Sequence, residues 1–185
     1  TEFNNVLFEY NFLNINEFEK LNLIGRKGYL KVYKVRNKKT NQIFIAYRFK
    51  IIMECYNKLY KNDNLFQEIN KLIGLNYPSI LKFIGYSPVD FKNEQIPMYL
   101  TENVVENSLY SFFYDENTNN IHLLDETKRL IILYGIASGM SYLHSLGIVH
   151  GNLDLVNIIL DNFLYPKIIG LDKSSKVSEN TIPNI

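Results

Sequence analysis

The sequence has little of several features that would place it in a specialised class of protein. Cys55 is the only cysteine among 185 residues, so no disulfide can form within the chain. The formal net charge is +1, which excludes the strongly basic footprint of a nucleic-acid or anionic-membrane binder. No Asn-x-Ser/Thr sequon occurs despite the many asparagines, and no signal-peptide pattern is visible in the first residues given. We therefore expect a cytoplasmic protein without a nucleic-acid partner.

Long apolar runs are also lacking. The longest, from Leu130 to Leu143, is shorter than the roughly 20 residues that span a bilayer and contains Gly and Ser. We therefore expect no membrane span. Hydrophobic residues make up 46% and charged residues 21% of the chain, which is typical of a globular protein with one sizeable core.

The first hundred residues are rich in strand patterns. Alternating apolar and polar residues predict strands over residues 18–24, 30–35 and 43–49, and a further strand over residues 98–104. Residues 1–17 show no clear period. They are either a docking extension or a loosely held lead-in.

Two helices are predicted by their period. A helical pattern begins near Asp63 and ends at Gly74. A second helix is expected from about Glu126 to Ser145, with Asp125 as its N-cap and Gly147 as its stop. Its apolar residues cover nearly all sides, as in a helix buried within a larger lobe.

The most informative stretch follows the second helix. Residues 142–149 read YLHSLGIV and residues 150–157 read HGNLDLVN. This wording resembles the catalytic loop of eukaryotic protein kinases, HRDLxxxN, in the form typical of the tyrosine-kinase-like group. The resemblance puts Asn152 at the position of the catalytic aspartate and Gly151 at that of the arginine. Asn157 stands at the position of the loop's metal-binding asparagine.

Residues 25–32, GRKGYLKV, resemble the kinase Gly-rich loop, with Gly25 at its first glycine and Val32 at the valine that covers adenine. The strand IAYR resembles the family's VAxK, with Ala46 in place and Arg48 at the lysine position. Lys50 lies on the same face of that strand, roughly 6–7 Å farther along, and could substitute. Taken alone, the first segment could be an ordinary hairpin with two glycines, and the second an ordinary strand with basic residues. The resemblance depends on these motifs occurring together and in the family's order.

The register of the next helix follows from LNYPSI at residues 75–80, which resembles the family's LxHPxI. In this register Glu68 is the helix glutamate that would pair with Arg48. The resemblance further implies that Thr101, Glu102 and Val104 line a nucleotide hinge. Ile159 would form the floor of the adenine slot, and Gly170 replaces the aspartate of the DFG motif.

These matches imply an α+β class and a protein-kinase-like bilobal fold. Residues 18–101 would form the lobe with an antiparallel sheet and one helix, after an extension over residues 1–17. Residues 102–185 would form the hinge and a partial helical lobe that ends in the activation segment. The rest of the helical lobe is not matched, so we expect a fragment or a truncated gene product.

The substitutions remove the parts that phosphoryl transfer requires. Asn152 cannot take a proton at physiological pH, and loss of a general base costs about 10²–10⁴ in rate. Gly170 offers no oxygen to magnesium, and Asn157 supplies only an amide oxygen. Arg48 keeps the charge of the family's lysine, but its planar fork differs in reach and geometry. The resemblance therefore implies weak ATP binding and an incomplete magnesium site.

Our hypothesis is a pseudokinase that acts as a scaffold or allosteric module for another signalling protein or kinase. The alternative is an active but atypical serine/threonine or tyrosine kinase that transfers phosphate from ATP to protein. An unrelated α+β domain and a non-functional gene fragment are the two remaining readings.

Overall fold

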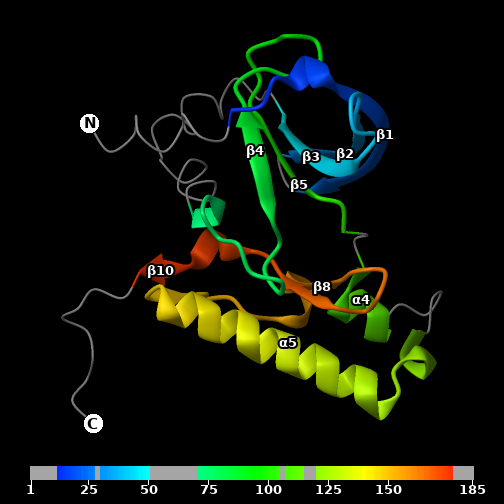
Figure 1. The fold of residues 1–185 in the computed structure, drawn as a ribbon, viewed down its shortest axis with the longest axis vertical. Helices are drawn as coiled ribbons and strands as arrows, with labels where there is room; N and C mark the ends of the chain where they lie inside the picture. The colour runs from blue at the N-terminus through cyan, green and yellow to red at the C-terminus, as the bar shows by residue number, and fades with distance from the viewer. Residues whose placement is uncertain (1–11, 28–29, 51–70, 105–106, 115–119, 177–185) are drawn as a thin grey trace. The chain divides into compact units, whose positions relative to one another are not determined.

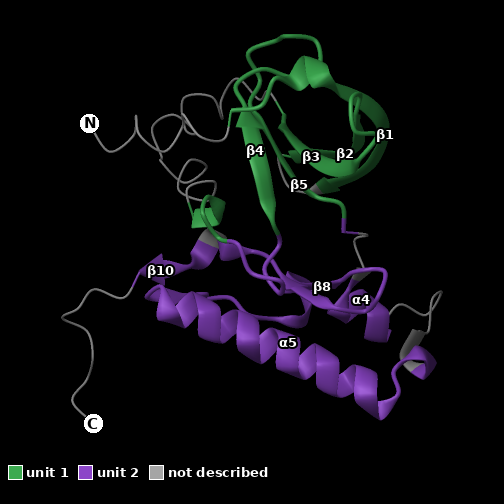
Figure 2. Cartoon of the chain, viewed as in Figure 1, with its two compact units in different colours: residues 1–75, 82–103 green, residues 76–81, 104–185 purple. Residues whose placement is uncertain are grey.

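The structure is a computed structural model that describes residues 12–27, 30–50, 71–104, 107–114 and 120–176. The chain divides into two compact units, which Figure 2 shows in different colours. Residues 1–75 and 82–103 form the sheet unit, and residues 76–81 and 104–185 form the helical unit.

A five-stranded antiparallel sheet is the framework of the sheet unit (Figure 1). Its strands are β1 (Phe18–Lys27), β2 (Leu30–Asn37), β3 (Ile43–Phe49), β4 (Phe83–Ser87) and β5 (Met98–Glu102). They lie in the order β1-β2-β3-β5-β4, with antiparallel pairing between neighbours. A short 3-10 helix, η1 (Ile15–Glu17), precedes β1 and is capped by the Asn14 side chain.

One face of this sheet carries the core of the unit. Val35 lies opposite Phe44, and Ala46 lies opposite Leu100. Directly opposed residues of antiparallel strands share a face, and side chains alternate along each strand. All four belong to one buried cluster, and we call their side of the sheet the core face. The other buried members of the cluster are Ile15, Phe18 and Met98.

The opposite side of the sheet, which we call the Val32 face, carries larger side chains on β3. Val32 lies opposite Tyr47, and Ile45 lies opposite Thr101. The Tyr47 ring stacks on Tyr99, with 4.7 Å between the ring centroids. Residues on this face are therefore separated from Ala46 by the thickness of the sheet.

The helical unit is built on one long helix, α5 (Glu126–Ser145), and a set of short elements. Those before α5 are β6 (Asn107–Ser108), α4 (Leu109–Tyr114) and η2 (Asn120–Leu123). Those after it are β7 (Ile148–Val149), η3 (Leu155–Asn157), β8 (Ile158–Leu160), β9 (Pro166–Ile168), η4 (Leu171–Lys173) and β10 (Ser175–Lys176). The strands form two small sheets, β6-β8-β9 and β10-β7.

Two glycines let α5 approach β9 closely. A Cβ atom built on Gly139 would lie 2.9 Å from Ile168, and one built on Gly135 would overlap Pro166. The segment before β4 reinforces the same strand, because the Ile168 N–H donates to the Ser79 carbonyl at 2.8 Å. This contact explains why residues 76–81 belong to the helical unit.

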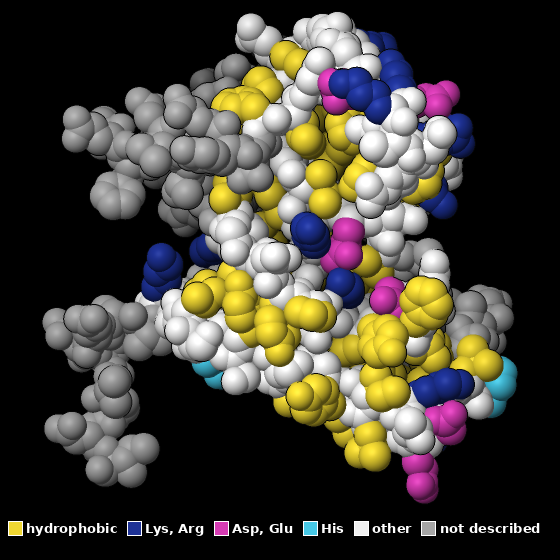
Figure 3. Space-filling view, viewed as in Figure 1, with side chains coloured by type: hydrophobic (Ala, Val, Ile, Leu, Met, Phe, Trp, Pro, Cys, Tyr) yellow, Lys and Arg dark blue, Asp and Glu magenta, His cyan; other side chains and the backbone are white. Residues whose placement is uncertain are grey.

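Only one stripe of α5 is buried within the described part of the chain. Ile132 and Leu143 are buried, whereas Leu130, Leu133 and Tyr134 are 66%, 62% and 77% exposed. Apolar side chains accordingly gather on the surface over this unit (Figure 3). The sequence predicted a helix that is apolar on nearly all sides and buried within a larger lobe. Among the described residues, several of these apolar side chains of α5 are instead exposed.

The predicted α+β class with an N-terminal antiparallel sheet is confirmed. So is the helix cap, since the Asp125 side chain accepts the Lys128 N–H at 2.8 Å. The strand β4 was not predicted from the sequence. Of the helix expected from Asp63 to Gly74, residues 63–70 lie outside the described residues.

Candidate functional site

The segment that resembles a catalytic loop begins at a buried histidine in the helical unit. His150 is 1% exposed. The Asn152 N–H donates to its Nδ1 at 3.2 Å, so Nε2 is the protonated nitrogen and donates to the Ile169 carbonyl at 2.9 Å. The ring thereby ties the start of the loop to the segment that follows β9. Both of its nitrogens are occupied, which makes His150 a structural residue.

Asn157 closes the other end of the loop. Its Nδ2 donates to the Asn152 carbonyl at 2.9 Å, and its own carbonyl accepts the Ile169 N–H at 2.9 Å. The structure thus brings Asn152 and Asn157 together, as the predicted site requires. Asn152 has an amide at the base position, which can accept a hydrogen bond but not a proton.

Gly170 packs directly against the Asn157 amide. It has a left-handed backbone with φ +76°, a conformation that favours glycine. A Cβ atom at this position would lie 2.5 Å from Asn157 Oδ1 and 2.7 Å from its Cγ. The space where a side chain would start is therefore filled by the amide.

A magnesium site does not fit these residues. Gly170 supplies no side-chain oxygen, and the amide of Asn157 is the single side-chain ligand that the two positions offer. Magnesium binds through carboxylates and phosphates in near-octahedral geometry. Nowhere in the described ranges do three His, Cys, Asp or Glu side chains gather as a metal site would require.

Gly151 is closed to side chains in the same way. Its φ is +73°, and a Cβ atom would lie 2.6 Å from the backbone carbonyl oxygen of Lys173. The backbone around η4 therefore occupies the space that an arginine at position 151 would enter. Positions 151 and 170, which are charged in the family that the sequence resembles, are therefore glycines at which a Cβ atom would meet neighbouring atoms.

In the sheet unit, the register divides the predicted nucleotide residues between two faces. Val32 and Thr101 lie on the Val32 face, and Gly25 lies opposite Val32 in the β1–β2 pair. Ala46 and Arg48 lie on the core face, because Ala46 is opposite Leu100. The structure therefore does not bring Arg48 together with Val32 and Thr101. The predicted partner Glu68 lies outside the described residues.

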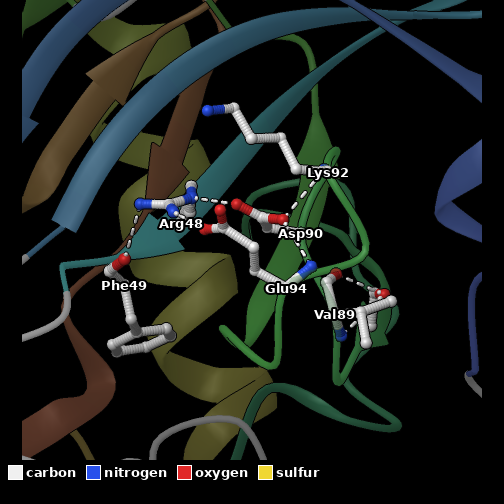
Figure 4. Close-up of polar contacts among 7 residues, drawn as sticks. Arg48, Phe49, Val89, Asp90, Lys92 and Glu94 are labelled. Atoms are coloured by element: carbon white, nitrogen blue, oxygen red, sulfur yellow. Dashed lines mark hydrogen bonds and ion pairs between the residues drawn. The ribbon is translucent and has the colours of Figure 1, made fainter.

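Arg48 is instead bound to the loop between β4 and β5 (Figure 4). Its Nε donates to Asp90 Oδ2 at 2.7 Å, and another guanidinium nitrogen lies 3.5 Å from Glu94 Oε2. A further guanidinium N–H donates to the Phe49 carbonyl at 3.2 Å. The Arg48 and Asp90 side chains are 15% and 3% exposed, so this is a largely buried ion pair.

Asp90 also organises its own loop. Its Oδ1 accepts the backbone N–H groups of Lys92 at 2.8 Å and Glu94 at 3.1 Å. Burial raises the pKa of the Asp90 carboxyl, but these hydrogen bonds and the Arg48 guanidinium outweigh it and hold the pKa below its ordinary value. Sequence reasoning missed Asp90. An aspartate that starts a polar turn was the available signal, but nothing local showed that its partner lies 42 residues earlier.

The predicted hinge residues lie at the end of β5 and just beyond it. Thr101 is buried, and Glu102 uses its carboxylate to accept the Lys82 N–H at 2.8 Å. In the helical unit, Val104 and Ile159 pack in one small apolar cluster with Leu81. The structure therefore brings the predicted hinge residue Val104 together with the predicted floor residue Ile159.

The sequence profile of the protein kinase domain matches residues 18–184. Because the match covers most of the 185 residues, the chain belongs to the protein kinase domain family. The predicted family is confirmed.

Several curated kinases are similar over most of this chain. Serine/threonine-protein kinase TNNI3K of Mus musculus is 31% identical over 150 residues, which cover 80% of this chain and 17% of that protein. Tyrosine-protein kinase receptor svh-2 of Caenorhabditis elegans is 30% identical, covering 88% of this chain and 14% of that protein. Probable serine/threonine-protein kinase samkA of Dictyostelium discoideum is 30% identical, covering 91% and 24%. The chain thus spans less than a quarter of the length of these relatives.

No helix among the described residues is both long enough and apolar enough to cross a membrane.

Proposed function

We propose that this protein-kinase-like domain is catalytically impaired and acts as a cytoplasmic scaffold or allosteric module for another signalling protein or kinase. The observation that carries the proposal is the packing of Gly170 against Asn157. A metal-binding carboxylate is missing at position 170, where a Cβ atom would meet the Asn157 amide and the backbone has a left-handed conformation that favours glycine. The loss is therefore built into the local fold.

Two further features support the proposal. The base position holds Asn152, whose amide cannot accept the proton of a substrate hydroxyl. Arg48, at the family's lysine position, is neutralised by Asp90 and lies on the opposite side of the sheet from Val32. A guanidinium that is held in a buried pair is not free to bind the phosphates of a nucleotide.

We expect ATP binding to be weak and independent of magnesium. Val32 and Thr101 share one face in the sheet unit, and Val104 and Ile159 cluster in the helical unit, so apolar groups suited to an adenine ring are retained. Tyr47 lies on the same face as Val32, and its large ring would leave less space for an adenine ring there. The phosphate end of such a site has no metal ligand set, and adenine contacts alone give limited affinity.

The second candidate is an active but atypical kinase that transfers phosphate from ATP to serine, threonine or tyrosine. The hydrogen bond between Asn157 and Asn152 favours it, because the loop keeps a closed geometry around the base position. Relatives whose names include both serine/threonine and tyrosine kinases are compatible with either acceptor.

Phosphotransfer from radiolabelled ATP to a general protein substrate, with magnesium or manganese, separates the two candidates. We expect no transfer above that of an unrelated protein, from the native chain or from Asn152→Asp, because the metal site stays incomplete. Asn157→Ala is the matched control, since it removes the remaining candidate ligand. Magnesium-dependent transfer that Asn157→Ala abolishes would contradict the proposal and support an active kinase.

Thermal-shift titration with ATP tests the nucleotide prediction separately. A small shift of equal size with and without magnesium is expected. A large shift that requires magnesium would show that other residues hold the metal.

A further inference from the structure

A small basic hollow lies on the core-face side of the sheet unit. It encloses about 180 Å³. Four cationic side chains line it, and they come from three strands and from the β4–β5 loop. They are Lys20, Lys31, Arg48 and Lys92. The volume is below the 300–1,000 Å³ that is usual for drug-sized ligands and nucleotides, so its occupant must be compact.

The charges around the hollow do not balance. Asp90 is the single carboxylate in the lining, and it is paired with Arg48 at 2.7 Å. Glu94, next to the hollow, also lies near Arg48, at 3.5 Å. Lys20, Lys31 and Lys92 form no ion pair with any residue in the described ranges. Four cations against two carboxylates leave an excess of two positive charges.

The Arg48–Asp90 pair fixes the part of the hollow that carries Lys92. Asp90 accepts the backbone N–H of Lys92, so the loop that carries Lys92 is fastened to β3 through Arg48. In Figure 4 the Lys92 side chain extends to the same side as Arg48. Lys31 lies directly opposite Arg48 in the β2–β3 pair and therefore shares its face. The hollow is thus preorganised by a buried ion pair.

Two aromatic rings complete the wall and position the third lysine. Tyr33 and Phe91 meet edge to face, with 6.0 Å between centroids. The Lys20 ammonium lies 5.3 Å from the centroid of Tyr33 and 6.0 Å from that of Phe91. Cation–π contacts of this kind hold an ammonium in place without neutralising it.

We propose that this hollow binds a phosphate group, either free or carried on a phosphorylated protein side chain. A phosphate monoester carries a charge of about −1.5 to −2 at pH 7 and has three strong acceptor oxygens. That charge matches the excess of two, and the three oxygens match the three unpaired ammonium groups. A single carboxylate would leave one positive charge uncompensated.

Titration with sodium phosphate, followed by two-dimensional NMR of the labelled chain, tests the proposal against sodium chloride of equal ionic strength. Shifts centred on Lys31, Tyr33 and Lys92 are expected, with a Kd on the order of 1 mM, as suits a five-atom ligand. Lys31→Gln should weaken binding about 5-fold, because one charge-assisted contact is lost. Lys34→Gln is the matched control on the same strand, since Lys34 lies on the Val32 face, and should leave the Kd unchanged.

Blocked phosphoserine, N-acetyl and C-amide, distinguishes the two sources of phosphate. Competition between it and inorganic phosphate at these amides indicates a site for phosphorylated protein, and binding of inorganic phosphate alone indicates a site for the free anion. Equal shifts with chloride, or equal weakening by Lys31→Gln and Lys34→Gln, would overturn the proposal. Both variants change half-buried side chains, and their spectra verify that they fold.

Discussion

In the sheet unit, the position that resembles the kinase lysine keeps a cation, Arg48, whose charge is balanced by Asp90 on the core face. In the helical unit, the positions that resemble the arginine and the metal-binding aspartate hold glycines, Gly151 and Gly170, packed against a carbonyl and an amide. In the sheet unit, the charged side chain is kept but forms an ion pair within the fold. In the helical unit, the side chains are absent and neighbouring atoms occupy the space where they would begin.

This difference predicts that the two units respond differently when the residues typical of kinases are restored. In the sheet unit, a lysine at position 48 would still face Asp90, because the strand register sets its direction. In the helical unit, a restored side chain would meet atoms that are already there. Restoring the kinase residues one at a time should therefore fail for a geometric reason in each unit.

The largest effect is expected for Gly170→Asp. The left-handed backbone costs about 1–2 kcal/mol for a non-glycine residue, and overpacking against Asn157 adds about 1–3 kcal/mol. The free energy of unfolding, measured with urea, should fall by about 2–5 kcal/mol. Gly147→Asp is the control, because Gly147 has φ +68° but nothing lies within 4 Å of its Cβ position. Equal losses in the two variants, together with new magnesium binding, would contradict the closed site.

Arg48→Met should have the next largest effect. Removing one partner of a buried pair typically costs 3–5 kcal/mol, and because Asp90 keeps two backbone N–H donors we expect about 2–4 kcal/mol. Arg36→Met is the control, since the Arg36–Glu19 pair is exposed and 3.7 Å long and should contribute about 0–1 kcal/mol. If Arg48 served a nucleotide instead, Arg48→Met would lower ATP affinity and leave stability unchanged.

The sequence predicted the main strands β1, β2, β3 and β5 and the helix α5, but not the faces that carry the site. Period and capping residues located β1, β2, β3 and α5 because these signals are local. The direction of Arg48 depends on the pairing of β3 with β5, and its partner Asp90 comes from a distant loop. Motif spacing aligned Gly170 with the position of the family's metal-binding aspartate. The contact with Asn157 that fills its place is tertiary and has no local signal.

The pH dependence of the free energy of unfolding should show the contribution of ionised Asp90 to stability. Its pKa is lowered in the folded state, so its ionised form contributes stability that is complete above the unfolded pKa of about 3.9 and is lost as pH falls through the lower folded value. Asp90→Asn should therefore be less stable than the native chain at pH 7, and the difference should shrink below about pH 4. Urea midpoints measured from pH 7 to 3 give this difference. A constant difference across the range would mean that ionisation of Asp90 is not the cause.

The smallest effect on stability is expected on the exposed side of α5. Leu133 is 62% exposed, so Leu133→Lys should change the free energy of unfolding by no more than about 0.5 kcal/mol. Contiguous apolar surface promotes association, and Leu130 and Tyr134 lie on the same exposed part of the helix. Sedimentation velocity should therefore show less association for Leu133→Lys than for the native chain, whereas Lys128→Gln, near the start of the helix, should match the native chain. A loss of several kcal/mol on Leu133→Lys would instead mean that this side chain is covered in the folded protein.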